Sequence, residues 1–200
     1  MKTIKTLLVA LVAVFALTAV SATAASAHTW KLKGAALKSA VKFHSTQELK
    51  FAEVKTGLEL ECAVIEEGTV GPGAAGEITS AKARECHSIR GCEAADSMEV
   101  EANSGLPWKT ELVTLYEGLR NQITSANAKW KIHCTVSETN WTNYCEATSS
   151  MAIENAKTSA EEVYDGKAPY GNCVNGPAGN FNTLGGGLLK NSLGEAFQAE

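Results

Sequence analysis

The chain has 200 residues, and its 22 acidic and 18 basic side chains give a formal net charge of −4 at pH 7. This balance argues against nucleic acid and against an anionic membrane surface as partners, because both require clustered Lys and Arg. The length suits one domain with a sizeable core of its own.

The first 27 residues predict an export signal. Lys2 and Lys5 give a positive start, residues 7–20 form an apolar run, and residues 25–27 are the small-residue pattern at which signal peptidases cut. The apolar run is shorter than the roughly 20 residues that cross a bilayer, and no second run of that length follows. We therefore expect residues 28–200 to be a single exported domain, secreted or held in the cell envelope, without an integral membrane segment.

Alternation of apolar and polar residues predicts half-buried β-strands in this domain. The side chains between the apolar positions, and most glutamates of the chain, are expected to face water. Three runs show one apolar face each: Val41 and Phe43; Leu58, Leu60, Cys62 and Val64; and Trp130, Ile132, Cys134 and Val136.

Glycine- and proline-rich segments divide these runs into short strands. Residues 71–76, "GPGAAG", predict a hairpin turn, and they lack the following helix that a dinucleotide-binding loop requires. Residues 158–166 predict one or two helical turns, and residues 179–197 a final hairpin or tail. The pattern predicts an all-β fold, an antiparallel sandwich or barrel of short strands. Two structural halves, about residues 28–112 and 113–200, stay open as a subdivision.

Six cysteines in an exported chain predict disulfides rather than zinc, because no closely spaced pair such as C-x-x-C is present. Positions about the turns favour Cys62–Cys86 and Cys134–Cys145, which leaves Cys92 with Cys173. The rival pairing Cys86–Cys92 closes the small loop between those two residues.

The sequence also resembles a group of exported, β-rich proteins of soil actinobacteria. The likeness is clearest over residues 57–112. The resemblance implies export and a β-rich fold, and it supplies no catalytic residue. The matching features are Trp30, the "EC" strand at Cys62, the glycine-rich hairpin of residues 68–78, Cys86, Cys92 and the "LPWKTEL" segment of residues 106–112.

Two tryptophans are candidates for a binding surface. Trp108 lies in "LPWKTEL" and Trp141 lies near a predicted turn. An exposed tryptophan is a frequent anchor for a partner or ligand, whereas the alternative for Trp108 is a place in the core.

A copper site is the one cofactor that the sequence suggests. Cleavage after Ala27 makes His28 the N-terminal residue, so that its α-amine and imidazole can join a second histidine in the flat three-nitrogen arrangement that suits copper. This starting point resembles the brace of exported copper proteins and oxidative polysaccharide-cleaving enzymes. The candidate second ligands are His44, His87 and His133.

These patterns favour a non-enzymatic exported β protein with a structural or binding role, as an envelope component or a binder of an extracellular ligand. No nucleophile elbow or Ser/His/Asp set stands out, and the two aspartates are too few for a calcium loop. The alternative is a copper-binding or oxidative enzyme that uses His28. A third hypothesis is a hydrolase with two catalytic glutamates.

Overall fold

The structure of the protein is a computed structural model. It describes residues 28–53, 57–92, 99–103, 105–125, 128–136, 139–146, 150–165, 171–174 and 180–200. At residues 53, 99–103, 134–136, 139–146, 165, 171–174 and 180–183 it describes the backbone alone. The predicted export signal, residues 1–27, lies outside the described part.

The described residues form β-strands joined by turns, which confirms the all-β prediction. The expected helical turns at residues 158–166 are wrong, because this segment holds a strand with a hydrogen-bonded neighbour on each side, and tertiary pairing overrides a weak helical preference. In chain order the strands are β1 (Trp30–Leu32), β2 (Ala35–Ala36), β3 (Val41–Glu53), β4 (Glu59–Val70), β5 (Ala75–Arg90), β6 (Glu99–Asn103), β7 (Trp108–Leu115), β8 (Gly118–Ile123), β9 (Lys129–Val136), β10 (Thr139–Glu146), β11 (Ser150–Glu154), β12 (Glu161–Asp165), β13 (Gly171–Val174), β14 (Asn180–Leu188) and β15 (Phe197–Ala199).

Eight of these strands close into an antiparallel barrel, one of the two expected architectures. Their order is β12–β11–β8–β7–β5–β4–β3–β14, and β14 pairs with β12 to complete the ring. The strands β3, β4 and β5 come from residues 28–112, and β8, β11, β12 and β14 come from residues 113–200. The two halves of the sequence therefore build one closed sheet together.

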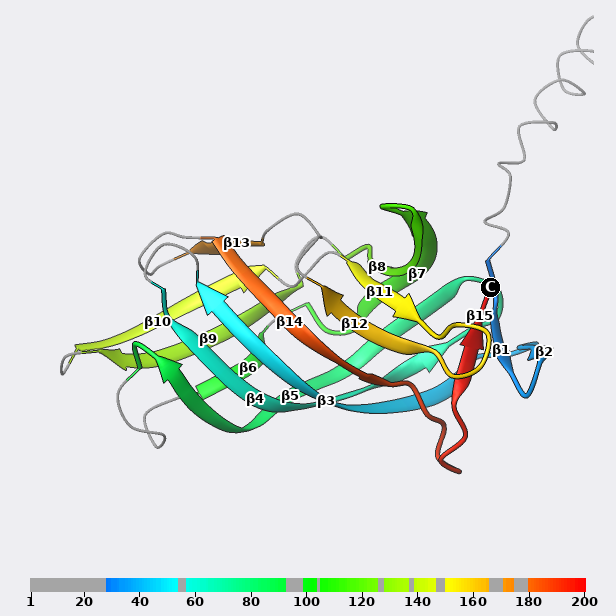
Figure 1. Ribbon diagram of the computed structural model, residues 1–200, viewed down its shortest axis with the longest axis horizontal. Helices are drawn as coiled ribbons and strands as arrows, with labels where there is room; N and C mark the ends of the chain where they lie inside the picture. Colours follow the sequence, from blue (N-terminus) through cyan, green and yellow to red (C-terminus); the bar gives the residue numbers. More distant parts are fainter. Residues whose placement is uncertain are drawn as a thin grey trace, which may run out of the picture.

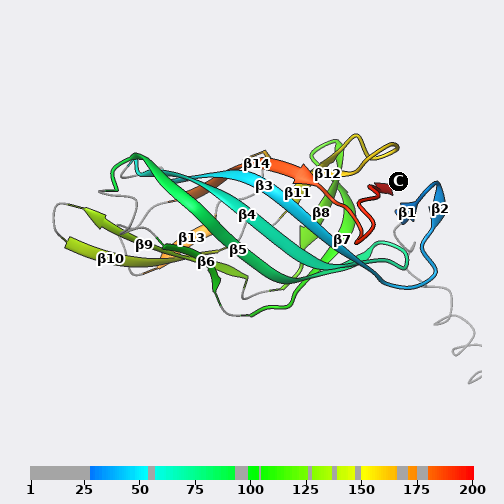
Figure 2. The ribbon, with the colours of Figure 1, turned by 90° about the horizontal axis from the view of Figure 1, so that it is seen from below.

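Three long strands, β3, β4 and β5, run along the molecule and connect its two ends (Figure 1). They have 13, 12 and 16 residues, longer than the short strands that the sequence suggested. At one end, β13, β10, β9 and β6 continue from β14 and return to β5 (Figure 2). The separate sheet β15–β1–β2 lies at the opposite end.

The turn at residues 71–76 connects β4 to β5, as predicted. The two strands pair antiparallel over most of their length, and the described backbone includes a cis peptide bond between Gly71 and Pro72. This long hairpin brings Cys62 and Cys86 together in a disulfide with a Cα–Cα distance of 4.1 Å.

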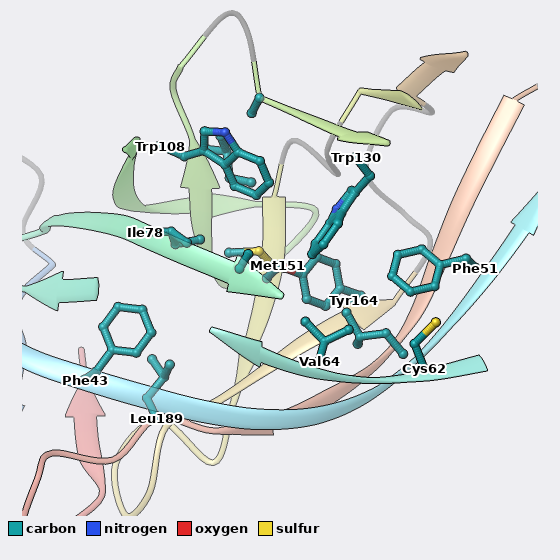
Figure 3. Close-up of a cluster of buried hydrophobic side chains, with 14 of the residues drawn as sticks. Phe43, Phe51, Cys62, Val64, Ile78, Trp108, Trp130, Met151, Tyr164 and Leu189 are labelled. Carbon is teal, nitrogen blue, oxygen red and sulfur yellow. The ribbon is translucent and has the colours of Figure 1, made fainter. Parts of the chain in front are cut away.

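An aromatic core fills much of the interior. Trp130 packs edge-on against Phe51, with ring centroids 5.5 Å apart, and against Trp108, with centroids 5.8 Å apart. Figure 3 shows these rings beside Met151 and Tyr164. The three aromatic residues lie on β9, β3 and β7, so this packing joins β9, which is not one of the eight barrel strands, to the barrel.

Candidate binding site inside the barrel

Six polar side chains meet inside the barrel, within an interior that is otherwise mostly apolar. Each is at most 2% exposed. They come from four strands: two from β3, one from β4, one from β8 and two from β12. Along β3 the polar positions lie between the buried Phe43 and Leu49. We call this set the interior cluster: Ser45, Gln47, Glu66, Asn121, Glu162 and Tyr164.

Hydrogen bonds organise the interior cluster around its two carboxyl groups. Glu66 accepts a bond of 2.7 Å on Oε1 from the hydroxyl of Tyr164, and a bond of 2.7 Å on Oε2 from Nε2 of Gln47. Glu162 accepts a bond of 2.6 Å on Oε1 from Nδ2 of Asn121. Amide and hydroxyl donors therefore hold three of the four carboxyl oxygens.

The part of the barrel between β12 and β3 carries no side chains at the level of the interior cluster. The strand β14 lies between them, and its residues 185–187 are all glycine. Gly187 lies opposite Glu162 in the strand register. A Cβ atom at Gly187 would lie 2.7 Å from Cγ of Gln47 and 2.9 Å from Oγ of Ser45. Glycine is needed here because the polar side chains of β3 pack directly on the backbone of β14.

Four polar atoms of the interior cluster have no hydrogen-bond partner among the described residues. A buried polar group without a partner costs about 1–3 kcal/mol, so such a concentration requires a physical reason. The cluster therefore has unused hydrogen-bonding capacity in one small region. These atoms are Ser45 Oγ, Gln47 Oε1, Asn121 Oδ1 and Glu162 Oε2; the indole nitrogens of Trp30 and Trp130 are also unpartnered.

Burial changes the acidity of both carboxyl groups. It raises the pKa of Glu66 to about 7, against the bonds from Tyr164 and Gln47, which favour the charged form. Burial, and next the negative charge of Glu66, raise the pKa of Glu162 to about 8, against the bond from Asn121. The two carboxyl groups titrate as one pair, because a negative charge on either of them makes the other harder to ionise. It retains protons at a pH where exposed glutamates are fully ionised.

The interior cluster was not predicted from the sequence. Most glutamates were expected to face water, whereas Glu66 and Glu162 are completely buried. The signal for Glu66 was present, since it lies in phase with Cys62 and Val64 on the inward face of β4. The signal for Glu162 was hidden, because its segment was interpreted as helical turns.

The four histidines lie at separate places in the described structure. His28 lies beside β7, where its Nε2 is 2.8 Å from Oγ1 of Thr114. His44 and His87 lie on exposed outer positions of β3 and β5, and His133 lies half-buried on β9. Among the described residues, no group of three His, Cys, Asp or Glu side chains is arranged to hold a metal ion. The copper brace stays a prediction.

Two surface hollows meet at His44. One, of about 500 Å³, is lined by Lys42, Glu67 and Thr69 among others. The other, of about 310 Å³, includes Glu161 and Lys190. Both combine opposite charges on the outer face of the barrel, and their polar atoms are open to water. They offer no concentration of unused buried groups like that of the interior cluster.

Trp108 is not a surface anchor. Its side chain is completely buried and packs against Trp130, because position 108 faces inward at the start of β7. The side chain of Trp141 lies outside the described part, so its role as a binding residue stays a prediction.

The cysteine predictions have mixed outcomes. The Cys62–Cys86 disulfide is confirmed, which excludes the rival Cys86–Cys92. The hairpin argument for Cys134–Cys145 is wrong, because the register places Cys134 opposite Trp141 and Cys145 opposite Trp130. Cys145 lies opposite Cys173 on β13. Cys92 is disulfide-bonded, and its predicted partner, the side chain of Cys173, lies outside the described part.

Comparisons with known proteins add no family to this picture. No protein-family model matches the chain, and neither a curated protein nor a solved structure is similar to it. Among the described residues, no helix has the length and apolar character needed to cross a membrane.

Proposed function

We propose that this chain is an exported, non-enzymatic binding protein that takes a small polar molecule into its barrel at the interior cluster. The supporting observation is the set of four unpartnered polar atoms on Ser45, Gln47, Asn121 and Glu162. A barrel with a purely structural role would be more stable with apolar side chains at these positions, since burying two carboxyl groups opposes folding. A bound molecule that satisfies these atoms offsets that penalty.

The architecture supports this role. An eight-stranded barrel encloses an interior that side chains can fill or that can hold one small ligand. Here the cluster lies among aromatic and aliphatic residues, including Phe43 and Leu49 along β3. A few polar groups within apolar walls are the usual composition of a small-molecule site, because the polar groups fix the orientation of the ligand.

Three probes of one shape test the proposal. Acetamidinium, acetamide and acetate are planar molecules of equal heavy-atom count that differ in charge and in hydrogen-bond donors. They are added to the isotope-labelled full chain after export, and the side-chain amide signals of Gln47 and Asn121 are followed by NMR. We expect at least one probe to shift both amide signals in a saturable manner. If no probe does so, the interior cluster is structural and the proposed function fails.

Export is tested separately by the intact mass of the secreted protein. We expect a chain that begins at His28 and lacks six hydrogens relative to its reduced form. The same spectrum, recorded under native conditions with and without added copper, tests the copper brace. One copper ion retained at His28 would favour the oxidative alternative.

A further inference from the structure

The unpartnered atoms of the interior cluster are mainly hydrogen-bond acceptors. Because Nε2 of Gln47 and Nδ2 of Asn121 donate to the carboxyl groups, the carbonyl oxygens of both amides are directed elsewhere and lack partners. Oε2 of Glu162 is a third acceptor, and the hydroxyl of Ser45 can donate or accept. A ligand that satisfies this site must supply several N–H or O–H donors.

The charge of the cluster points in the same direction. In the described part of the chain, the salt bridges lie elsewhere: Lys31–Glu200, Lys33–Glu195, Lys50–Glu59 and Lys109–Glu77. Arg120 adjoins Asn121, but its guanidinium donates to Oγ and to the carbonyl of Ser150, at 2.9 and 3.1 Å. Among the residues that the structure describes, neither Glu66 nor Glu162 forms a salt bridge with a basic side chain.

The groups that face the carboxyl pair from the surrounding strands are neutral. Tyr164 on β12 is titratable, but burial raises the pKa of its phenol well above the usual value, so it remains a donor. The remaining inward residues around the pair cannot titrate: Ser45 and Gln47 on β3, Val64 on β4, Asn121 on β8, Met151 and Ile153 on β11, and residues 185–187 on β14.

We infer that the ligand of the interior cluster is a small organic cation with several N–H donors, of the amidinium or primary ammonium class, and that it binds in exchange for a proton of the Glu66–Glu162 pair. This inference rests on the proposed function. In the free protein a proton keeps the buried pair from carrying two charges. When the cation enters, one carboxyl group gives its proton to the solvent, and the resulting carboxylate pairs with the cation.

Binding of this kind depends on pH in a defined direction. Affinity for the cation rises as the pH rises, because the proton that competes with it becomes easier to remove. With one proton released per cation, the dissociation constant falls about tenfold for each pH unit below the titration of the pair. A neutral ligand would show no such dependence.

The three probes distinguish this inference from the proposed function itself. We expect acetamidinium to shift the amide signals of Gln47 and Asn121 at pH 8, with at least tenfold weaker binding at pH 6, and acetate to have no effect. Calorimetry in phosphate and in HEPES buffer, neither of which contains a primary ammonium group, should give binding enthalpies that differ by the difference between the ionisation enthalpies of the two buffers.

Other outcomes overturn the inference in recognisable ways. If acetamide binds as well as acetamidinium, the interior binds ligands but is not selective for cations, and the proposed function stands without the inference. If calcium ions shift the amide signals and acetamidinium does not, the organic class is wrong. If no probe has an effect, both proposals fail.

Matched variants locate the binding. Glu162→Gln keeps the size of the side chain and removes one charge of the pair, so acetamidinium binding should weaken at least tenfold and depend less steeply on pH. Glu161→Gln changes the neighbouring residue, which lines the outer hollow, and should leave binding unchanged. Equal effects of the two variants would place the cation on the outer surface and refute the inference. The amide spectrum of each variant checks that it is folded.

Discussion

The hydroxyl of Tyr164 on β12 donates a 2.7 Å hydrogen bond to Oε1 of Glu66 on β4, and 98 positions of sequence separate the two residues. The strands β14 and β3 lie between β12 and β4 in the barrel. Glycines at 185–187 leave β14 without side chains at this level. This bond therefore depends on closure of the whole barrel, and it ties Glu66 to the strand that also carries Glu162.

The stability of the protein should fall as the pH rises from about 5 to about 8. Glu66 and Glu162 have raised pKa values in the folded state, so in this window the folded chain binds more protons than the unfolded chain. The free energy of unfolding therefore decreases as the pH rises through this window, and the stabilisation is fully present below about pH 4. Urea denaturation at a series of pH values measures this slope. A stability that increases over this window would contradict the burial of the pair.

Replacing Glu162 by Gln should make the protein more stable at pH 8 and reduce the slope of stability with pH. The amide cannot ionise, so it removes both its own burial penalty and its repulsion of Glu66. Denaturation curves at pH 5 and pH 8 check the change, and Glu161→Gln on the same strand is the control. A variant with the same pH slope as the original protein would show that Glu162 does not titrate in the folded state in this range.

Replacing Tyr164 by Phe should destabilise the protein by about 1–3 kcal/mol, and more at pH 8 than at pH 5. The change leaves Oε1 of Glu66 buried without its donor, and this loss is greater when Glu66 is ionised. Thermal unfolding at both pH values measures the difference. Tyr116→Phe is the control, because Tyr116 is 56% exposed; similar effects at both tyrosines would contradict the predicted role of Tyr164.

Replacing Gly187 by Ala should destabilise the protein by about 1–3 kcal/mol through overpacking. The new Cβ would lie 2.6 Å from the carbonyl oxygen of Thr46, which is backbone and cannot rotate away. Gly118→Ala is the control, since a Cβ there meets no atom within 4 Å. Thermal unfolding compares the two variants, and the amide signals of Gln47 report displacement of the cluster. An unchanged melting temperature for Gly187→Ala would show that β14 does not pack against Ser45 and Gln47 in this way.

Peptide mapping under non-reducing conditions should recover Cys62 joined to Cys86, as the structure shows. We further expect Cys145 with Cys173, because they lie opposite each other on paired strands, and therefore Cys92 with Cys134. Loss of the Cys62–Cys86 bond through a double Ser substitution should lower stability by about 2–4 kcal/mol. A recovered Cys92–Cys173 peptide would instead support the pairing predicted from the sequence.

The pattern of apolar and polar residues was sufficient to predict an all-β fold. The period-two pattern around Cys62 predicted strands, because a residue on a strand either faces the core or faces away, and this choice is local. The turn at residues 71–76 predicted the β4–β5 hairpin and hence the Cys62–Cys86 bond for the same reason. Between β9 and β10 the register places Cys134 opposite Trp141, so the hairpin argument for pairing Cys134 with Cys145 does not hold there.

The closure of the strands, and the set of polar residues that meet inside, depend on long-range packing. The pairing of β14 with β12 joins segments whose neighbours the local pattern does not specify. The same closure buries Glu66 and Glu162 in one interior, although an isolated glutamate is more stable in water. The buried place of Glu162 follows from contacts with β11, β14 and Asn121, so its raised pKa is a property of the assembled barrel. Local residue preferences predict the strands, whereas long-range packing determines which polar groups are buried together and how acidic they are.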